Sequence, residues 1–381
     1  MVNLPNKEDE NQKVLRQLLE KKDHELYLNY DKKQYKLVSK RRKWILYENN
    51  WIRINRRYYF DRIAKKYKCL LDEKLKIEKY QHITNEERQY MFEMVAENKM
   101  TFSQVRKAYK NRFSTCTIHN LIKRHSVNNY SSLIINPELF PFIFIDIDDT
   151  FQNLRVNNKK STFRFRIVHF YQFFDSERKK FINEIKMVVV TKCNGFEIND
   201  KEQITNKINE VITKNYGNKD KFQIFVSSDG ARNLKKIAEY FNAIHAIDKY
   251  HVFNRIYLTF RTSQLITLNW MLNDQSEKSS SKINLRKEIQ ELVKNYEVDS
   301  AILRLNEIKK DSFTQCYSLN SLIKYLQNNK TSIETWKNVS YTGTYTETYV
   351  QQLVKSYFGN VGRCFSKDIF TKMLAANCLV F

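Results

Sequence analysis

The feature that most constrains the fold is a series of three apolar segments in the middle of the chain, joined by short polar turns. The segments are FIFIDIDDTF (142–151), KKSTFRFRIVHFYQFF (159–174) and INEIKMVVVTKC (182–193). Apolar runs bounded by polar turns predict β-strands, and short turns join consecutive strands into an antiparallel meander. A helix over 201–217 and another strand, QIFVSSDG (223–230), follow. The sequence therefore predicts a domain built around a β-sheet.

Three antiparallel strands followed by a helix and a strand are the order in which an RNase H-like domain begins. We therefore expect the first part of an RNase H-like catalytic core at residues 141–254. Residues 255–340 have the polar, periodic pattern of helices and predict an all-helical insertion. A final helical stretch predicts a C-terminal catalytic helix region at residues 341–381. The expected fold class is a multidomain α+β protein rich in α-helix.

Smaller regions are expected before this core. Residues 1–48 are dense in Lys, Glu, Asn and Tyr, with apolar residues at helical spacing, and predict a helical arm. Residues 49–83 form a small basic strand region. Its segment WIRINRRYYF (51–60) alternates apolar and basic residues as a half-exposed strand does. This alternation leaves three basic side chains available to an outside partner: Arg53, Arg56 and Arg57.

Residues 84–130 have the rhythm of a helix-turn-helix domain. Thr84 caps the first helix with Glu87 at the capping-box position, Thr101 or Ser103 opens the second, and Ser114 or Thr115 opens the third. In that motif the last helix lies in the major groove. The residues placed for base edges are Thr115, Thr117, His119 and Asn120, and those placed for phosphates are Lys123 and Arg124. Further basic candidates on the second helix are Arg106, Lys107 and Lys110. The alternative is an ordinary helical hairpin.

Acidic residues interrupt the first apolar segment. An aspartate within an apolar strand is costly to bury unless it is paired or binds a metal. Asp146 and Asp148 are two residues apart and therefore point to the same face of the sheet, whereas Asp149 points away. The alternative is a frayed strand end where these acids are solvated. Periodicity alone does not separate Asp146 from Asp148.

A second group of polar residues follows the later strands. Asp229 stands at the carboxyl end of a strand, before Gly230 and a helix, which is where α/β sheets bind ligands. In HAIDKYHVFNRI, Asp248 and His251 are three residues apart near the end of another short strand. They predict either a capping pair or two side chains facing the same opening. Because imidazole is softer than Mg²⁺ prefers, we expect His251 to orient a carboxylate or the scissile strand.

The third carboxylate is expected on a helix after the insertion. Glu347 begins an apolar-periodic helix in SYTGTYTETYVQQLVKSYFGN, and Glu334 is the next choice. Alone, Glu347 is equally explained as a favourable charge at a helix N-terminus. Converging carboxylates can hold two Mg²⁺ ions about 4 Å apart for phosphodiester chemistry. The expected cofactor is Mg²⁺, with Mn²⁺ as a substitute.

The charge of the chain favours a polyanionic partner. Lys and Arg number 66 against 42 Asp and Glu, which gives a formal net charge of +24. Nucleic acid is the simplest partner for such a chain. The low content of Gly and Pro beside abundant Lys and Asn indicates an A+T-rich coding sequence, which also raises the Lys content. Double-stranded DNA is therefore the expected partner, with RNA as an alternative supported only by charge and aromatic content.

The cysteines and the hydropathy of the chain predict its cellular compartment. The six cysteines form no C-x-x-C pair and predict reduced thiols. The N-terminus lacks the apolar stretch of a signal peptide, and no run approaches 18 apolar residues. We expect a cytoplasmic, nucleoid-associated protein with no membrane partner.

The sequence resembles D-D-E transposases of the ISLre type, which are related to the Mutator superfamily, and the transposase-like proteins of mollicute integrative conjugative elements. The resemblance covers roughly residues 45–375. Its motifs are WIRINRRYYF, KKYKCLLDEKLKI (65–77), FIFIDIDDTF, SSDGA, the DxxH of IDKYH and TETYVQQLVKSYFGNVGRCFS. It implies an RNase H-like catalytic domain with a helical insertion and a metal-binding triad of Asp148, Asp229 and Glu347. This resemblance favours Asp148 over Asp146.

The resemblance implies an enzyme that binds element ends through residues 50–125, cuts a phosphodiester and joins the freed 3′-hydroxyl to target DNA. It also implies a homodimer or higher oligomer on DNA. The sequence departs from the pattern at Asp149 and at Arg232 with Asn233, where relatives often carry other residues. The alternatives are a structure-selective nuclease and a catalytically retired transposase-like protein that only binds DNA.

Overall fold

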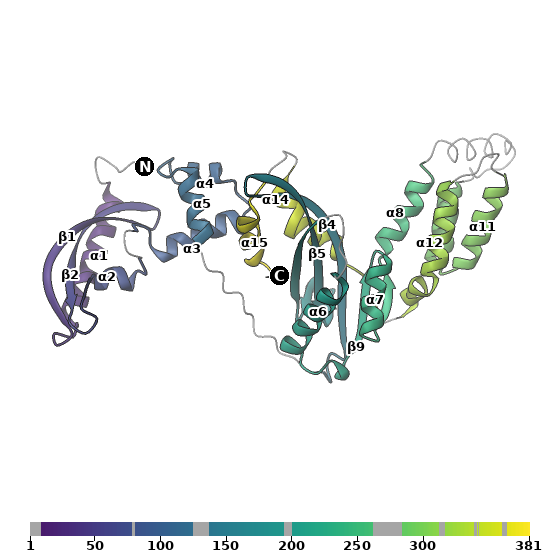
Figure 1. Cartoon of the computed structure of the whole chain (residues 1–381), viewed down its shortest axis with the longest axis horizontal. Helices are drawn as coiled ribbons and strands as arrows, with labels where there is room; N and C mark the ends of the chain where they lie inside the picture. Colours follow the sequence, from purple (N-terminus) through teal and green to yellow (C-terminus); the bar gives the residue numbers. More distant parts are fainter. Residues whose placement is uncertain are drawn as a thin grey trace. The chain divides into compact units, whose positions relative to one another are not determined.

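The computed structural model describes residues 9–77, 81–124, 137–193, 200–261, 284–311, 317–338, 341, 343–359 and 364–381 (Figure 1). The chain divides into two compact units. Unit 1 comprises Met1–Asn129 and Phe365–Asn377, and unit 2 comprises Tyr130–Cys364 and Cys378–Phe381. The chain therefore passes from unit 1 to unit 2, returns for one segment and ends in unit 2.

Unit 1 begins with a helix and a three-stranded antiparallel sheet in the order β1-β2-β3. The elements are α1 (Glu10–Leu28), β1 (Tyr35–Tyr47), β2 (Asn50–Asp61), β3 (Lys66–Lys68) and α2 (Leu70–Lys74). The prediction of a helical arm to residue 48 is wrong beyond Leu28, because YKLVSKRRKWILY forms β1. Glu48 and Asn49 take left-handed backbone angles, φ 47° and 57°. Such angles make the tight turn of a β-hairpin, and the turn pairs β1 with β2.

Three short helices follow in unit 1: α3 (Asn85–Ala96), α4 (Phe102–Ala108) and α5 (Thr115–Arg124). The predicted caps at Thr84, Thr101 and Ser114 are present, each accepting a backbone N–H of the helix that it opens. Glu87 does not complete a capping box. Its carboxylate instead accepts a hydrogen bond of 2.8 Å from the Tyr109 hydroxyl, which ties α3 to the end of α4.

The fourth helix of this group comes from the other end of the sequence. Helix α15 (Lys367–Ala375) packs on α3 and α5, and Phe370 and Leu374 are fully buried there. Residues 365–377 thus belong to unit 1. We expected them in a catalytic helix region at 341–381, so that prediction is corrected for this segment.

Unit 2 is built on a mixed six-stranded sheet with the order β10-β9-β4-β5-β8-β11. Strands β4, β5 and β8 pair antiparallel, which confirms the predicted meander. Strands β9 and β10 continue the sheet in parallel with β4, and β11 pairs in parallel with β8. The strands are β4 (Phe142–Val156), β5 (Lys159–Tyr171), β8 (Ile185–Lys192), β9 (Gln223–Ser228), β10 (Ile244–Ile247) and β11 (Leu379–Val380). A small hairpin of β6 (Phe173–Asp175) and β7 (Lys180–Ile182) lies between β5 and β8.

One face of the sheet packs against two helices. Ile143, Ile145 and Ile147 of β4 share a core with apolar residues of α6 (Asp200–Asn215) and α7 (Arg232–Tyr240). A 3-10 helix, η1 (Lys219–Lys221), leads from α6 into β9. Because side chains alternate along a strand, the even-numbered residues of β4 face the other way.

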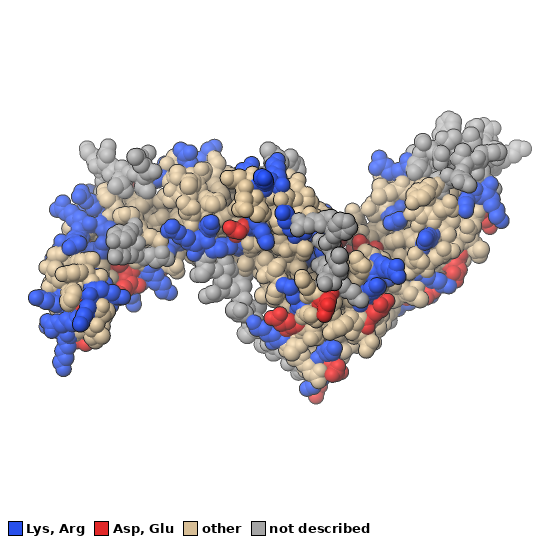
Figure 2. All heavy atoms as spheres, in the orientation of Figure 1, with Lys and Arg blue, Asp and Glu red and all other residues tan. Residues whose placement is uncertain are grey.

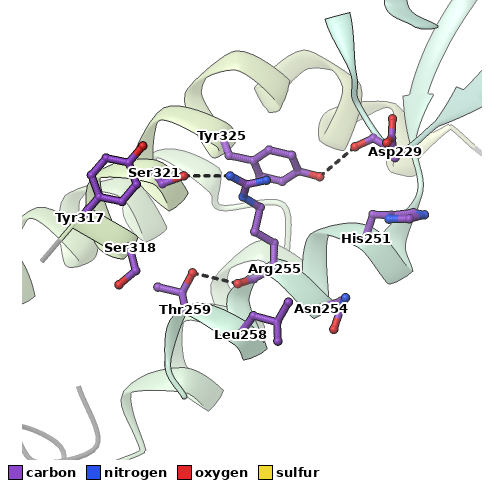
Figure 3. A pocket seen from close by; sticks show the side chains of 10 residues that line it. All are labelled: Asp229, His251, Asn254, Arg255, Leu258, Thr259, Tyr317, Ser318, Ser321 and Tyr325. Atoms are coloured by element: carbon purple, nitrogen blue, oxygen red, sulfur yellow. Dashed lines mark hydrogen bonds between the residues drawn. The ribbon is translucent and has the colours of Figure 1, made fainter. Parts of the chain in front are cut away.

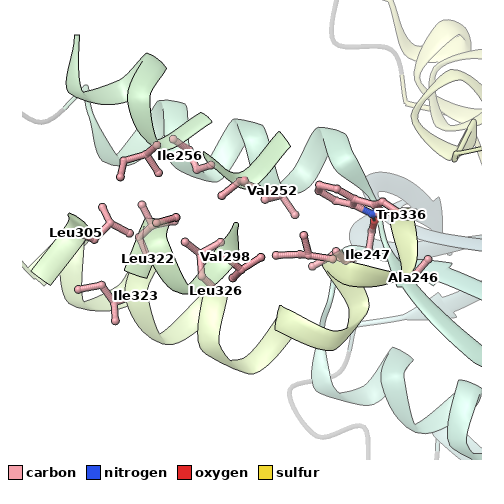
Figure 4. Packing of buried hydrophobic residues seen from close by; sticks show 14 of the residues in the cluster. Ala246, Ile247, Val252, Ile256, Val298, Leu305, Leu322, Ile323, Leu326 and Trp336 are labelled. Atoms are coloured by element: carbon pink, nitrogen blue, oxygen red, sulfur yellow. Dashed lines mark hydrogen bonds between the residues drawn. The ribbon is translucent and has the colours of Figure 1, made fainter. Parts of the chain in front are cut away.

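The second face carries a helical group that extends away from the sheet (Figure 4). Phe144, Ile247, Val252, Leu322 and Trp336 belong to its core. The helices are α8 (Lys249–Thr259), α10 (Leu285–Lys294), α11 (Val298–Asp311), α12 (Tyr317–Glu334) and η2 (Thr335–Lys337). The described part of residues 255–340 is helical, as predicted. After it come α13 (Thr346–Tyr349), the π-helix η3 (Val350–Lys355) and α14 (Ser356–Phe358).

At this level the fold is a mixed α/β protein with helices on both faces of a mixed sheet. Among the described helices, none combines the length and the apolar composition needed to cross a bilayer.

Candidate active site

Three aspartates stand close to the point where the parallel pairing of β4, β9 and β10 ends, Asp148 within β4 and the other two just after β9 and β10. Asp146 of β4 is paired in register with Ser227 of β9, and Ser227 is paired with Ala246 of β10. Two residues further along each strand direction stand Asp148, Asp229 and Asp248. Pairing in register places these three positions in a row, which we call the aspartate row. Ligands bind at this edge of α/β sheets.

Helix α8 brings a histidine to the aspartate row. Asp248 caps the helix by accepting a hydrogen bond of 2.9 Å from the Tyr250 backbone N–H. His251 lies on the first turn, with its Nε2 atom 3.8 Å from Asp248 Oδ2 and 3.9 Å from Asp148 Oδ1. Asp248 is therefore both a helix cap and a neighbour of Asp148 through His251. The DxxH motif thus provides a helix cap through Asp248, and it also places Asp248 and His251 side by side near Asp148.

The charges of these groups depend on one another. Burial raises the pKa of Asp248, and the nearby Asp148 carboxylate adds to this, while hydrogen bonds from Thr344 and Tyr250 act in the opposite direction. Burial acts to lower the pKa of His251. The contact with Asp148 and the charges of Asp148, Asp248 and Asp229 outweigh burial, so the pKa of His251 is raised. A protonated His251 is thus favoured between the carboxylates.

Asp229 is the most accessible member of the row. Its Oδ1 atom accepts a hydrogen bond of 2.8 Å from the Ala231 backbone N–H, which fixes the turn into α7. Its backbone carbonyl accepts a hydrogen bond of 3.3 Å from the Tyr325 hydroxyl of α12. The Asp229 side chain lines a pocket of about 450 Å³ between α8 and α12, together with His251 (Figure 3). The aspartate row therefore adjoins an open space through Asp229 and His251.

Asp146 belongs to a separate, enclosed network. Its Oδ2 atom lies 3.7 Å from His169 Nδ1 and accepts a hydrogen bond of 3.4 Å from the Tyr345 backbone N–H. Burial raises the pKa of the Asp146 carboxyl. His169 Nε2 lies 2.9 Å from Glu184 Oε1, and the Tyr349 hydroxyl donates to the same carboxylate. Asp146 and Asp148 share a face as predicted, but only Asp148 stands in the aspartate row.

Sequence reasoning did not single out His169 and Glu184. The register of the meander contains the missing signal, because Asp146 is directly opposite His169 across β4 and β5. An acid and a histidine that face each other inside apolar strands would have indicated a paired group.

Both candidate glutamates lie near lysine side chains. Glu347 lies on α13 and pairs with Lys355, with 3.0 Å between Oε1 and Nζ. Glu334 ends α12, where its charge acts on Lys330. Across the described residues, no three acidic, histidine or cysteine side chains form a group that could hold one metal ion. Contacts and the lining of the pocket bring Asp148, Asp229, Asp248 and His251 together, and the Glu347 side chain is paired with Lys355.

The three arginines of β2 that were predicted to bind DNA differ in their exposure to solvent. Arg53 is exposed. Arg56 pairs with Asp72 at 3.1 Å and Arg57 pairs with Asp23 at 2.6 Å, and both arginine side chains are only 11% exposed. The expectation that Arg56 and Arg57 are available to a partner is therefore wrong, because each neutralises a carboxylate within unit 1.

The helical candidates are mostly at the surface. Thr117 and His119 are half-buried, and the exposed candidates are Arg106, Lys107, Lys110, Thr115, Asn120, Lys123 and Arg124. Strand β1 adds four exposed basic residues that were not among the predicted DNA-binding residues: Lys36, Lys40, Arg41 and Arg42. Figure 2 shows lysine and arginine side chains gathered over the surface of unit 1.

The sequence matches the uncharacterised protein family UPF0236 over residues 6–377, and the chain belongs to that family. A comparison with curated proteins found no match. Among solved structures, a chain of the simian T-cell lymphotropic virus intasome in complex with PP2A regulatory subunit B56 gamma is similar at 9% identity and a TM-score of 0.19. That similarity covers 50% of this chain and 64% of the intasome-complex chain.

Proposed function

We propose that this protein is a DNA transposase of the D-D-E type that cuts and joins DNA with Mg²⁺ at the aspartate row. The observation that carries the proposal is the placement of Asp148, Asp229 and Asp248 at one level of the sheet edge, beside His251 and an open pocket. Buried or half-buried acids are costly unless a cation accompanies them. An edge with several such acids is suited to hold cations and the phosphodiester that they bind.

The order of elements supports an RNase H-like core. Strands β4, β5 and β8 are antiparallel, helix α6 follows, and β9 and β10 then extend the sheet in parallel on the other side of β4. This is the order that the resemblance to D-D-E transposases implies. The helical group between Asp229 and Glu347 occupies the place of the implied insertion.

The chemistry of the donor set fits Mg²⁺, which prefers oxygen ligands. Asp148 and Asp229 would hold the metal, and Glu347 is the third ligand by resemblance, although Lys355 neutralises it in the structure. When bound, Mg²⁺ supplies Lewis-acid stabilisation of the charge that develops on the phosphodiester. His251 lies within 4 Å of Asp148 and Asp248 and is proposed to orient these carboxylates.

Unit 1 supplies the proposed DNA-binding surface. Helices α4 and α5 with their caps are proposed to act as a helix-turn-helix, with Thr115 and Asn120 toward base edges and Lys123 and Arg124 toward phosphates. A formal net charge of +24 favours contact with the phosphate backbone. Association with the nucleoid and assembly as a homodimer or higher oligomer on DNA belong to the same proposal.

The test is cleavage and strand transfer by the full chain on labelled duplexes made from the DNA that flanks its gene, with Mg²⁺ or Mn²⁺. We expect Asp148→Asn and Asp229→Ala to lower the rate by at least about 100-fold. Asp220→Asn is the matched control, because Asp220 is exposed in η1 of the same unit. Undiminished cleavage by Asp229→Ala would overturn the assignment, and cleavage without joined products would favour a nuclease.

A second candidate is a catalytically retired transposase-like protein that binds DNA without cutting it. The ion pair between Glu347 and Lys355 favours this candidate, because a carboxylate that is paired with a lysine is less available to a metal ion. Titration calorimetry with Mn²⁺ discriminates between the two. The enzyme binds the metal and loses binding in Asp148→Asn, whereas the retired protein releases no heat in either form.

A further inference from the structure

The pocket beside the aspartate row has a lining that the proposed metal chemistry does not use. Its walls are one face of α8 and one face of α12 (Figure 3). On α8 the lining residues are His251, Asn254, Arg255, Leu258 and Thr259, which recur at the three- and four-residue spacing of a helix face. Val252 and Ile256 lie on the adjacent face and bury themselves in the helical core. The lining of the pocket is therefore held in place by helices that pack against each other through a hydrophobic core.

The pocket contains one positively charged side chain whose orientation is fixed, that of Arg255. Arg255 lies with its guanidinium carbon 4.7 Å from the centre of the Tyr325 ring and donates a hydrogen bond of 2.8 Å to the Ser321 hydroxyl. In the described part of the chain, no acidic side chain forms an ion pair with this guanidinium. The ring and the hydroxyl fix its orientation and leave several of its five N–H groups unused. A fixed guanidinium of this kind suits a phosphate.

An aromatic ring stands at the surface of the same pocket. Tyr317 opens α12 and is 86% exposed, the highest fraction among the large hydrophobic side chains of the described residues. Leu258, 54% exposed, contributes an apolar surface on α8. The Asn254 amide provides both a donor and an acceptor. A flat ring, an amide and a guanidinium are the groups that hold a nucleobase and its phosphate.

We propose that this pocket binds a single unpaired nucleotide of the DNA next to the scissile phosphate. Arg255 holds its phosphate and Tyr317 stacks on its base. This inference rests on the proposed function, because Asp229 and His251 line the same pocket and would act on the neighbouring phosphodiester. A volume of about 450 Å³ is within the range of single-ligand pockets. A base inside a duplex enters such a space only after it leaves the stack.

The experiment compares two fluorescent duplexes, one blunt and one ending in a single unpaired 2-aminopurine nucleotide. Binding to the full chain is measured by anisotropy without added metal, so that no strand is cut. We expect the wild type to prefer the unpaired end by about tenfold, a factor typical of one stacked base. Tyr317→Ala and Arg255→Ala are expected to abolish the preference, and quenching of 2-aminopurine is expected to disappear with it.

Two variants serve as controls. Tyr317→Phe keeps the ring and is expected to keep the preference. Lys324→Ala removes a positive charge from the exposed part of α12, outside the pocket, and is expected to affect both duplexes equally. Because Tyr317 is exposed, its replacement leaves the core intact, and the test does not depend on Arg255→Ala folding normally.

Equal binding of the two duplexes by the wild type, or an unchanged preference in Tyr317→Ala, would overturn the pocket assignment. These outcomes are distinct from failure of the proposed function. If Asp148→Asn and Asp229→Ala still cut DNA, the proposed function fails whatever the duplexes show. If those variants stop cutting while Tyr317→Ala keeps the preference, only the pocket assignment fails.

Discussion

Gly230 fixes the position of Asp229 at the residue scale. It has a φ of +84°, and a Cβ atom there would lie 2.6 Å from Ile247 Cδ1 and 2.8 Å from Asn329 Oδ1. Gly217 has a similar φ of +85°, but a Cβ atom there meets nothing within 4 Å. An alanine at Gly217 would therefore meet only the cost of a left-handed backbone, whereas an alanine at Gly230 would also meet a steric clash.

We predict that Gly230→Ala lowers the free energy of unfolding by about 2–4 kcal/mol, because backbone strain and overpacking both contribute. Gly217→Ala is expected to cost only about 1–2 kcal/mol, since strain alone remains. Denaturant titration of both variants measures the difference. Equal losses would mean that the close approach of Ile247 and Asn329 relaxes without cost.

The arginines of β2 give a second residue-scale prediction. Arg57→Ala leaves Asp23, whose side chain is 3% exposed, without its ion-pair partner. We expect a loss of about 3–5 kcal/mol in stability. Arg53→Ala is expected to leave stability unchanged and to reduce the salt dependence of duplex binding by about one unit of log–log slope. Thermal unfolding and anisotropy at several salt concentrations check both, and a reversed pattern would contradict the assignment of roles.

At the scale of elements, His245 ties α12 to the sheet. Its Nδ1 atom lies 2.7 Å from the Ser332 hydroxyl of α12, and its Nε2 atom lies 3.0 Å from the Ser228 hydroxyl of β9. Trp336 of η2 adds a hydrogen bond of 2.7 Å to the Ile247 carbonyl. Burial, with the nearby charge of Lys235, lowers the pKa of His245 from 6.5 to about 4. The link between sheet and helix therefore contains a neutral histidine.

This link predicts a loss of stability in acid. Between pH 6.5 and about 4 the unfolded chain binds a proton at His245 that the folded chain does not, so stability falls as the pH falls. The full effect is at most about 3 kcal/mol. Denaturant titrations at several pH values should show a shallower fall for His245→Asn than for the wild type. An identical fall in both would exclude His245 as its source.

Elements with a strong local pattern were predictable from the sequence, and their partners were not. The meander, the helix before Asp229 and the caps at Thr84, Thr101 and Ser114 follow from alternation and short-range hydrogen bonding. Strand β1 differs from the predicted helix, because a basic, polar stretch has no local signal that separates a half-exposed strand from a helix. Its pairing with β2 through the left-handed turn at Glu48 and Asn49 decides the matter.

In the candidate site, too, the residues could be identified from the sequence but their arrangement could not. Asp148, Asp229, Asp248 and His251 were each identified from local sequence, but their alignment depends on the register of β4, β9 and β10. The same register separates Asp148 from Asp146, which periodicity could not do. The position of Glu347 depends on how α13 packs, and the sequence contains no local signal for its ion pair with Lys355.

At the scale of the whole molecule, the chain visits unit 1 twice. Residues 365–377 return to unit 1, and β11 then completes the edge of the sheet in unit 2. Helix α15 buries Ile369, Phe370, Met373 and Leu374, which are at most 1% exposed. Burying four such side chains contributes on the order of 5 kcal/mol or more. The proposed DNA-binding helices therefore depend on a segment that follows most of unit 2 in sequence.

We predict that a chain ending at Cys364 loses duplex binding, although every basic candidate of unit 1 remains. Without α15, the apolar faces of α3 and α5 are exposed to water, so α5 is no longer held in place. A chain ending at Asn377 keeps α15, loses only β11, and is expected to bind duplex DNA like the full chain. Anisotropy measures binding of both chains, and circular dichroism reports the loss of helix. Because the two truncations differ only in residues 365–377, equal binding by both would show that unit 1 folds and reads DNA without its second segment.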